Sequence, residues 1–139
     1  MKIFYYMSVL TLIMGFLMIG LVAYWMLYPY KPVVFNDPEF PIINNIVKQG
    51  QMLIYTSNYC KYMNIPAQVT RTFANEILYV TPSTITNRPM GCNIIHISVL
   101  VPQELPIGTY QLQQTYVFQV NPIRQITITE KTEEFQVIQ

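Results

Sequence analysis

The feature that most constrains this chain is an uncharged, apolar stretch near its N-terminus, residues 3–28. As an α-helix rising about 1.5 Å per residue, this stretch would be about 39 Å long, enough to cross a bilayer with some tilt. The sequence therefore predicts a transmembrane signal anchor over residues 1–28, a proline spacer over residues 29–32, and a single domain over residues 33–139.

Aromatic residues bracket the apolar stretch at both ends. Tyr5 and Tyr6 lie near its start, and Tyr24, Trp25 and Tyr28 lie near its end. Tyrosine and tryptophan concentrate at the two membrane–water interfaces, where the ring is half apolar and half polar. We therefore expect these five side chains to anchor the helix in membrane lipid.

Two other interpretations of this stretch stay open. A buried helix of a soluble protein has the same composition, but the remaining residues are too few to cover such a helix on every side. A cleaved signal peptide also fits in part, because Lys2 supplies a positive start and Ala23 a small residue. Against cleavage, the apolar run exceeds the usual length, and Leu21 is large where a small residue is preferred.

Small and hydroxyl-bearing residues mark one side of the predicted helix. Ser8, Thr11 and Gly15 recur at helical spacing, and such residues let a second transmembrane helix approach closely. The spacing predicts a helix–helix contact there, although small residues also occur in such helices by chance. Because Lys2 precedes the helix, we expect a cytoplasmic N-terminus and a periplasmic or extracellular domain.

After the spacer, apolar residues recur every second position and not with a helical period. Turn-forming clusters of Gly, Pro and Asn separate these segments. The clearest strand is 109–120, where Gln114 is the one polar residue on the apolar face. The other predicted strands are 52–57, 67–73, 77–80, 93–101 and 125–135, with a first strand near 33–36 or 42–47.

The segment PQELPIGTYQL, residues 102–112, resembles a corner of immunoglobulin-like domains in bacterial and phage extracytoplasmic proteins. In those domains a Pro and Gly corner commonly precedes a Tyr-led penultimate strand, as Gly108 precedes Tyr110 here. The resemblance implies an all-β, seven-stranded immunoglobulin-like Greek-key sandwich after the transmembrane helix.

In such a sandwich the second and fifth strands pair antiparallel, so the end of one lies beside the start of the other. Cys60 follows the second predicted strand and Cys92 precedes the fifth. The resemblance therefore implies a Cys60–Cys92 disulfide, and with it an oxidising compartment. Two unrelated buried thiols or a metal or redox site are the alternatives. His96 is the only histidine, and no Cys-x-x-Cys spacing occurs.

The composition gives no sign of an enzyme. Of the eight basic residues only Lys2 precedes the domain, which leaves seven against seven acidic residues. A neutral domain has no electrostatic footprint for nucleic acid. No phosphate loop, nucleophile motif or metal-spaced cluster occurs, so we predict no catalytic residue, no metal, no cofactor and no small-molecule substrate.

With few residues ahead of the helix, the chain is expected to act through its external domain or through the helix. The alternate turns of the predicted sandwich place Gln49, Gln103, Glu104 and Leu105 at its distal tip, as a possible partner surface. The leading prediction is a non-enzymatic interaction or structural subunit that docks onto another membrane, envelope or virion protein. The alternative is a phage-encoded envelope effector acting in lysis or superinfection exclusion.

Overall fold

A computed structural model of the protein describes residues 2–75 and 77–139. The described residues form one helix and nine strands, and the chain divides into two compact units. One unit runs up to Tyr30 and also contains Asn121–Arg124; the other contains Lys31–Val120 and Gln125–Gln139. Each unit is described by itself below.

Helix α1 (Lys2–Leu27) is apolar on every side. Its segment Ile3–Leu27 has a mean hydropathy of 2.2, and 0% of the most apolar window is buried within the protein. A helix that is apolar all round belongs either in a protein core or in a membrane. The described residues cover none of the most apolar window, which favours the membrane over a protein core. The chain has a helix long and apolar enough to span a membrane.

The C-terminal end of α1 is capped by two side chains from Asn121–Arg124, in the same unit. The last carbonyls of an α-helix have no partner within the helix. Asn121 Nδ2 donates to the carbonyl of Trp25 at 2.9 Å, and Arg124 Nη1 donates to the carbonyls of Met26 and Tyr28, each at 2.7 Å. The positive charge also suits the negative end of the helix dipole.

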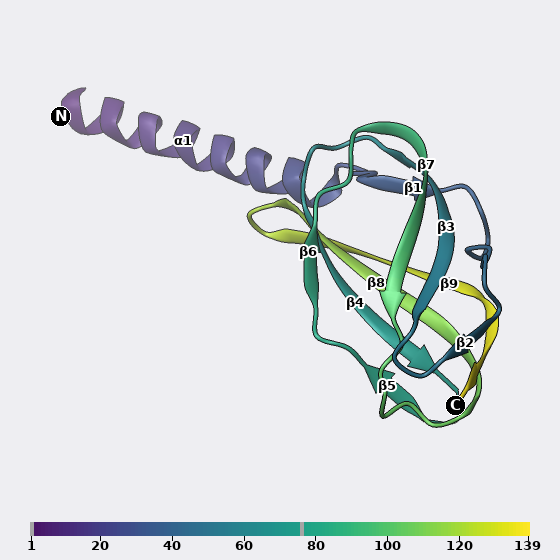
Figure 1. The fold of residues 1–139 in the computed structure, drawn as a ribbon. Coiled ribbons are helices and arrows are strands. Elements are labelled where there is room, and N and C mark those ends of the chain that lie inside the picture. The colour runs from purple at the N-terminus through teal and green to yellow at the C-terminus, as the bar shows by residue number, and fades with distance from the viewer. Residues whose placement is uncertain (1, 76) are drawn as a thin grey trace. The chain divides into compact units, whose positions relative to one another are not determined.

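The second unit consists of two open sheets (Figure 1). The smaller has the order β1-β3-β7, formed by β1 (Val33–Phe35), β3 (Met52–Lys61) and β7 (Gly91–Leu100). The larger has the order β2-β9-β8-β4-β5, and β6 pairs with β4. Its strands are β2 (Ile46–Lys48), β4 (Ala67–Ala74), β5 (Leu78–Val80), β6 (Thr84–Thr86), β8 (Gly108–Asn121) and β9 (Arg124–Ile138).

An all-β domain after an N-terminal helix is confirmed, but the predicted count of seven strands is wrong. The two candidate positions for a first strand are both used, by β1 and β2. The further strand β6 has only three residues between Pro82 and Pro89, too few to show an alternating pattern. In addition, β2 pairs with β9 in parallel, and such short pairings leave almost no periodic signal.

Alternation along β8 follows the prediction. The side chains of Tyr110, Leu112, Gln114, Tyr116 and Phe118 are buried, and those at the alternate positions 111, 113, 115 and 117 are more exposed. The residues of the two sheets that face each other form two separate apolar clusters. Aromatic contacts are frequent in them; the rings of Phe40 and Tyr55, for example, stack with centroids 5.6 Å apart.

Candidate functional site

A layer of polar side chains lies between the two apolar clusters. It contains Ser57 of β3, Arg71 of β4 and Gln114 of β8, each at an inward-facing position of its strand. Arg71 and Gln114 lie directly opposite each other in the pairing of β4 with β8. The inward-facing neighbours two residues away are Tyr55 and Tyr59, Val69 and Phe73, and Leu112 and Tyr116. The polar layer therefore separates the two apolar clusters at the same height along the strands of both sheets.

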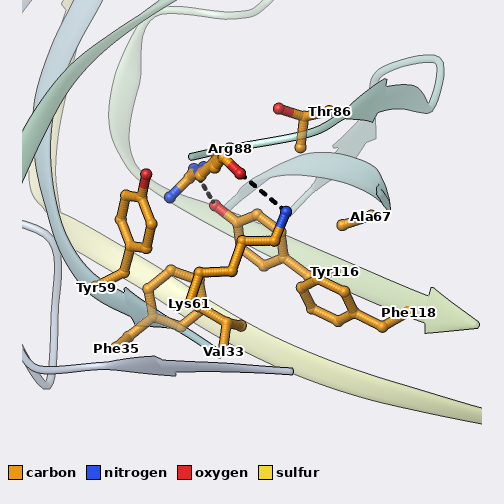
Figure 2. Close-up of a pocket in the computed structure, with 9 residues that line it drawn as sticks. All are labelled: Val33, Phe35, Tyr59, Lys61, Ala67, Thr86, Arg88, Tyr116 and Phe118. Atoms are coloured by element: carbon orange, nitrogen blue, oxygen red, sulfur yellow. Dashed lines mark hydrogen bonds between the residues drawn. The ribbon is translucent and has the colours of Figure 1, made fainter. Parts of the chain in front are cut away.

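Arg88, in the segment between β6 and β7, joins this layer (Figure 2). Its Nη1 donates to Ser57 Oγ and its Nη2 to Tyr116 Oη, each at 2.9 Å. The guanidinium carbon lies 5.0 Å from the ring centroid of Tyr59, 5.2 Å from that of Tyr116 and 5.9 Å from that of Phe35. A guanidinium among aromatic faces gains cation–π attraction, which offsets part of the cost of removing it from water.

Gln114 is fully buried and is the acceptor that joins two tyrosines. Its Oε1 accepts from Tyr55 Oη at 2.8 Å and from Tyr116 Oη at 2.9 Å. Burial raises the pKa of both phenols, although the charges of Arg71 and Arg88 act in the opposite direction. Both hydroxyls therefore stay protonated at neutral pH and can donate these hydrogen bonds.

Lys61 is buried at the edge of the same cluster, with 4% of its surface exposed. Its Nζ donates to Asn87 Oδ1 at 2.6 Å and to the carbonyl of Arg88 at 2.9 Å. Burial and the nearby charge of Arg88 lower the pKa of this ammonium group. The hydrogen-bond partners of Lys61 and Arg88 among the described residues are all neutral, so a buried and a half-buried cation lie close together with no described carboxylate bonded to either one.

The layer has unused donors and little space. Arg71 Nε, Gln114 Nε2 and Tyr59 Oη are buried and have no hydrogen-bond partner among the described residues. The cavity beside Lys61 and Arg88 has a volume of about 10 Å³, which corresponds to roughly one water molecule. An organic substrate does not fit in a space of this size.

The predicted disulfide is present. Cys60 of β3 and Cys92 of β7 lie directly opposite each other in antiparallel strands, with their Cα atoms 3.9 Å apart, and they form the bridge. Neither cysteine is free, so the alternatives of separate thiols or a metal site do not hold. The described residues contain no group of three or more possible metal ligands. His96 Nδ1 lies 3.1 Å from Thr56 Oγ1 on the exposed face.

The four residues predicted as a distal partner surface come together at the end of β3 farthest from the disulfide. Gln49 Nε2 donates to the carbonyl of Leu105 at 2.6 Å, and Gln103 packs beside Gly50. Gln103 and Glu104 are exposed, but only 1% of Leu105 is. The prediction of Leu105 as a contact residue is wrong, because its apolar side chain folds back into the core.

The helix residues are arranged as a helix requires, and their roles stay predictions. The rings of Tyr5 and Tyr6 lie 6.0 Å apart, and those of Tyr24 and Tyr28 lie 5.3 Å apart. Thr11 satisfies its hydroxyl by donating to the carbonyl of Met7 at 2.9 Å. Ser8 and Gly15 are exposed, and Trp25 is partly exposed. A Cβ at Gly15 would meet no atom of the described residues within 4 Å.

The sequence did not point to Arg71, Arg88 or Lys61 as members of one cluster. A weak signal was available, since Gln114 interrupts an otherwise apolar face and Arg71 interrupts another. What no pattern shows is that the two interruptions lie at the same level of the sandwich, because that depends on the strand register. A comparison with protein-family models and with curated protein sequences finds no match.

Proposed function

We propose that this protein is a membrane-tethered, non-enzymatic interaction or structural subunit. An immunoglobulin-like β domain on the extracytoplasmic side would dock onto another membrane, envelope or virion protein. The observation that carries the proposal is the combination, in one short chain, of an uncovered apolar helix with a disulfide-bonded β domain. Neither feature alone would be sufficient.

The helix supports tethering because leaving it in water would be very unfavourable. Side chains such as Phe4, Phe16 and Leu27 expose 74% to 81% of their surface. Removing each such side chain from water stabilises the protein by roughly 1.5 to 3 kcal/mol, and insertion of the helix into a bilayer achieves this. The disulfide supports the extracytoplasmic side, because such bonds persist mainly in oxidising compartments.

The domain supports a docking role through its surface. The cavity beside Lys61 and Arg88 has room for about one water molecule, so a partner would be bound on the outside of the domain and not in this cavity. Two sheets with an antiparallel β3–β7 pair and a β9-β8-β4 series are compatible with an immunoglobulin-like arrangement, with β2 and β6 added. Folds of this kind commonly present edges and loops to other proteins.

The test uses the full chain expressed in a bacterial envelope. We expect it to stay in the membrane pellet after an alkaline carbonate wash, and its domain to be cleaved by protease added outside the inner membrane. Chemical cross-linking followed by purification in mild detergent should give a defined complex with a second protein. A soluble chain, a protected domain or a lone monomer would each contradict the proposal. Lysis or altered phage adsorption on expression alone would favour an effector instead.

A substitution in the helix tests whether it also contributes a contact. Gly15→Leu is expected to weaken any helix-mediated association in cross-linking, because the larger side chain keeps a second helix at a distance. Gly20→Leu is the matched control: Gly20 is equally open, and it lies about 140° round the helix axis from Gly15. If both variants, or neither, change the size of the complex, the side formed by Ser8, Thr11 and Gly15 is not a contact.

A further inference from the structure

We propose that the free edge of β7 is the docking site of this domain, and that its occupant is an extended segment of a partner protein that carries a carboxylate. The inference rests on the proposed function and specifies its surface. It is argued from the open backbone of β7, from the side chains that β7 leaves partly uncovered, and from Arg71 in the neighbouring groove, whose Nε has no hydrogen-bond partner among the described residues.

One side of β7 pairs with β3, and the strand order of the described residues leaves its other side open. Val101, just beyond β7, bonds towards the β3 side, since its N–H donates to Gln51 and its carbonyl accepts from Gly50. Backbone groups alternate in direction along an antiparallel strand. Hence Ile94, His96, Ser98 and Leu100 direct their N–H and C=O groups towards the open side.

The inward-facing side chains of β7 also lack a neighbouring strand on the open side of β7. On the paired strand β3, the inward-facing Tyr55, Ser57 and Tyr59 are all 0% exposed. On β7 the inward-facing Ile95 and Ile97 are only partly buried. Natural edge strands usually carry a charge or a proline that prevents further pairing. The sequence of β7, GCNIIHISVL, contains neither.

Next to this edge lies an open groove of about 600 Å³. Val99 and Leu100 line it from β7, and Arg71 and Thr84 line it from the opposite sheet. Gln103 and Glu104, predicted from the sequence as partner contacts, also line it. A strand added to β7 would therefore extend the smaller sheet across this groove, towards the opposite sheet. There it would cover the exposed parts of Ile95 and Ile97.

The chemistry of Arg71 indicates what the occupant carries. Its Nε is buried and has no hydrogen-bond partner among the described residues, although the guanidinium also interacts with Thr84, where Nη1 lies 3.3 Å from Oγ1, and with the hydroxyl of Tyr55. Arg88 and Lys61 also form hydrogen bonds only with neutral groups among the described residues. A carboxylate on the inward face of an added strand would supply the missing acceptor. A second copy of β7 would not, because β7 contains no acidic residue.

The test measures peptide binding to the full chain in mild detergent by fluorescence anisotropy. The probe is a short labelled peptide in which Val and Thr alternate and Glu replaces the central Val; the reference peptide has Gln at that position. We expect the Glu peptide to bind about tenfold more tightly than the Gln peptide. Arg71→Gln should remove this difference while the circular dichroism of the domain stays unchanged.

Ser98 provides a matched pair of variants for the edge itself. Ser98→Pro removes the outward N–H and should weaken binding of both peptides about tenfold or more, whereas Ser98→Ala, which loses only the hydroxyl, should bind as the wild type does. Ile94→Lys is a second blocking variant if Ser98→Pro does not fold. Equal binding by the proline and alanine variants would overturn the inference.

Other outcomes separate this inference from the proposed function. If neither peptide binds and Ser98→Pro turns a dimer into a monomer in sedimentation, the occupant is a second copy and the inference is wrong. If Ser98→Pro and Ser98→Ala give the same cross-linked complex with a second protein, the function stands and this surface is rejected. A chain that leaves the membrane in the carbonate wash contradicts the function itself.

Discussion

Gln114→Leu is expected to lower the free energy of unfolding by about 3 kcal/mol, although leucine is the more hydrophobic residue. Gln114 Oε1 is the acceptor for the hydroxyls of Tyr55 and Tyr116, and all three side chains are buried. Removing the acceptor leaves two hydroxyl groups that cannot reach water, and an unmade buried hydrogen bond costs more than a made one contributes. Urea unfolding of the full chain in detergent, followed by near-ultraviolet circular dichroism, measures the loss.

Gln119→Leu is the matched control, since it makes the same exchange on the exposed face of the same strand. It removes an exposed hydrogen bond, which Gln125 Nε2 donates to Gln119 Oε1 at 2.8 Å, so we expect it to change the free energy of unfolding by about 1 kcal/mol or less. Adding Tyr55→Phe to Gln114→Leu should recover part of the loss, because one of the two stranded hydroxyls is then removed. Equal effects of the two glutamine variants, or no recovery in the double variant, would show that the polar layer does not act as a bonded unit.

The helix and the long strands could be predicted from the sequence because each carries a strong local period. An uncharged run of this length has few alternatives to a membrane. The strands β3, β4, β7, β8 and β9 are each eight residues or longer, and the alternating pattern had located all five. The Cys60–Cys92 disulfide was implied by the resemblance to immunoglobulin-like domains, in which the second and fifth strands pair.

The remaining features depend on contacts between segments far apart in sequence. The pairing of β2 with β9 joins residues about ninety positions apart, and β6 is too short for a periodic signal. Leu105 is buried because its loop folds back onto the core. The sequence does not indicate this, because its polar neighbours Gln103 and Glu104 suggest an exposed loop. Arg71 and Gln114 become partners in one layer only through the register of β4 and β8. The local sequence pattern therefore predicted the helix and the long strands, but it did not predict the polar layer between the sheets.

Replacing both cysteines, in Cys60→Ala/Cys92→Ala, is expected to lower the free energy of unfolding by about 3 to 4 kcal/mol. The bridge joins residues separated by 32 positions, and in the chain-entropy model closing such a loop restricts the unfolded chain by about this amount. A small domain has a total stability of only about 5 to 15 kcal/mol, so the loss is large. Each single replacement should cost nearly as much as the double, since either one removes the whole bridge.

The matched control lies on the same two strands. Thr56 and His96 are directly opposite each other in the β3–β7 pairing and are joined by one exposed hydrogen bond, so Thr56→Ala/His96→Ala should cost about 1 kcal/mol or less. Because β3 is the only strand bonded to β7 among the described residues, loss of the bridge should also speed amide exchange along β7 more than along β8. If the oxidised and reduced proteins unfold at the same urea concentration, the bridge does not stabilise the fold. If exchange rises equally in β7 and β8, it does not specifically fasten the edge strand.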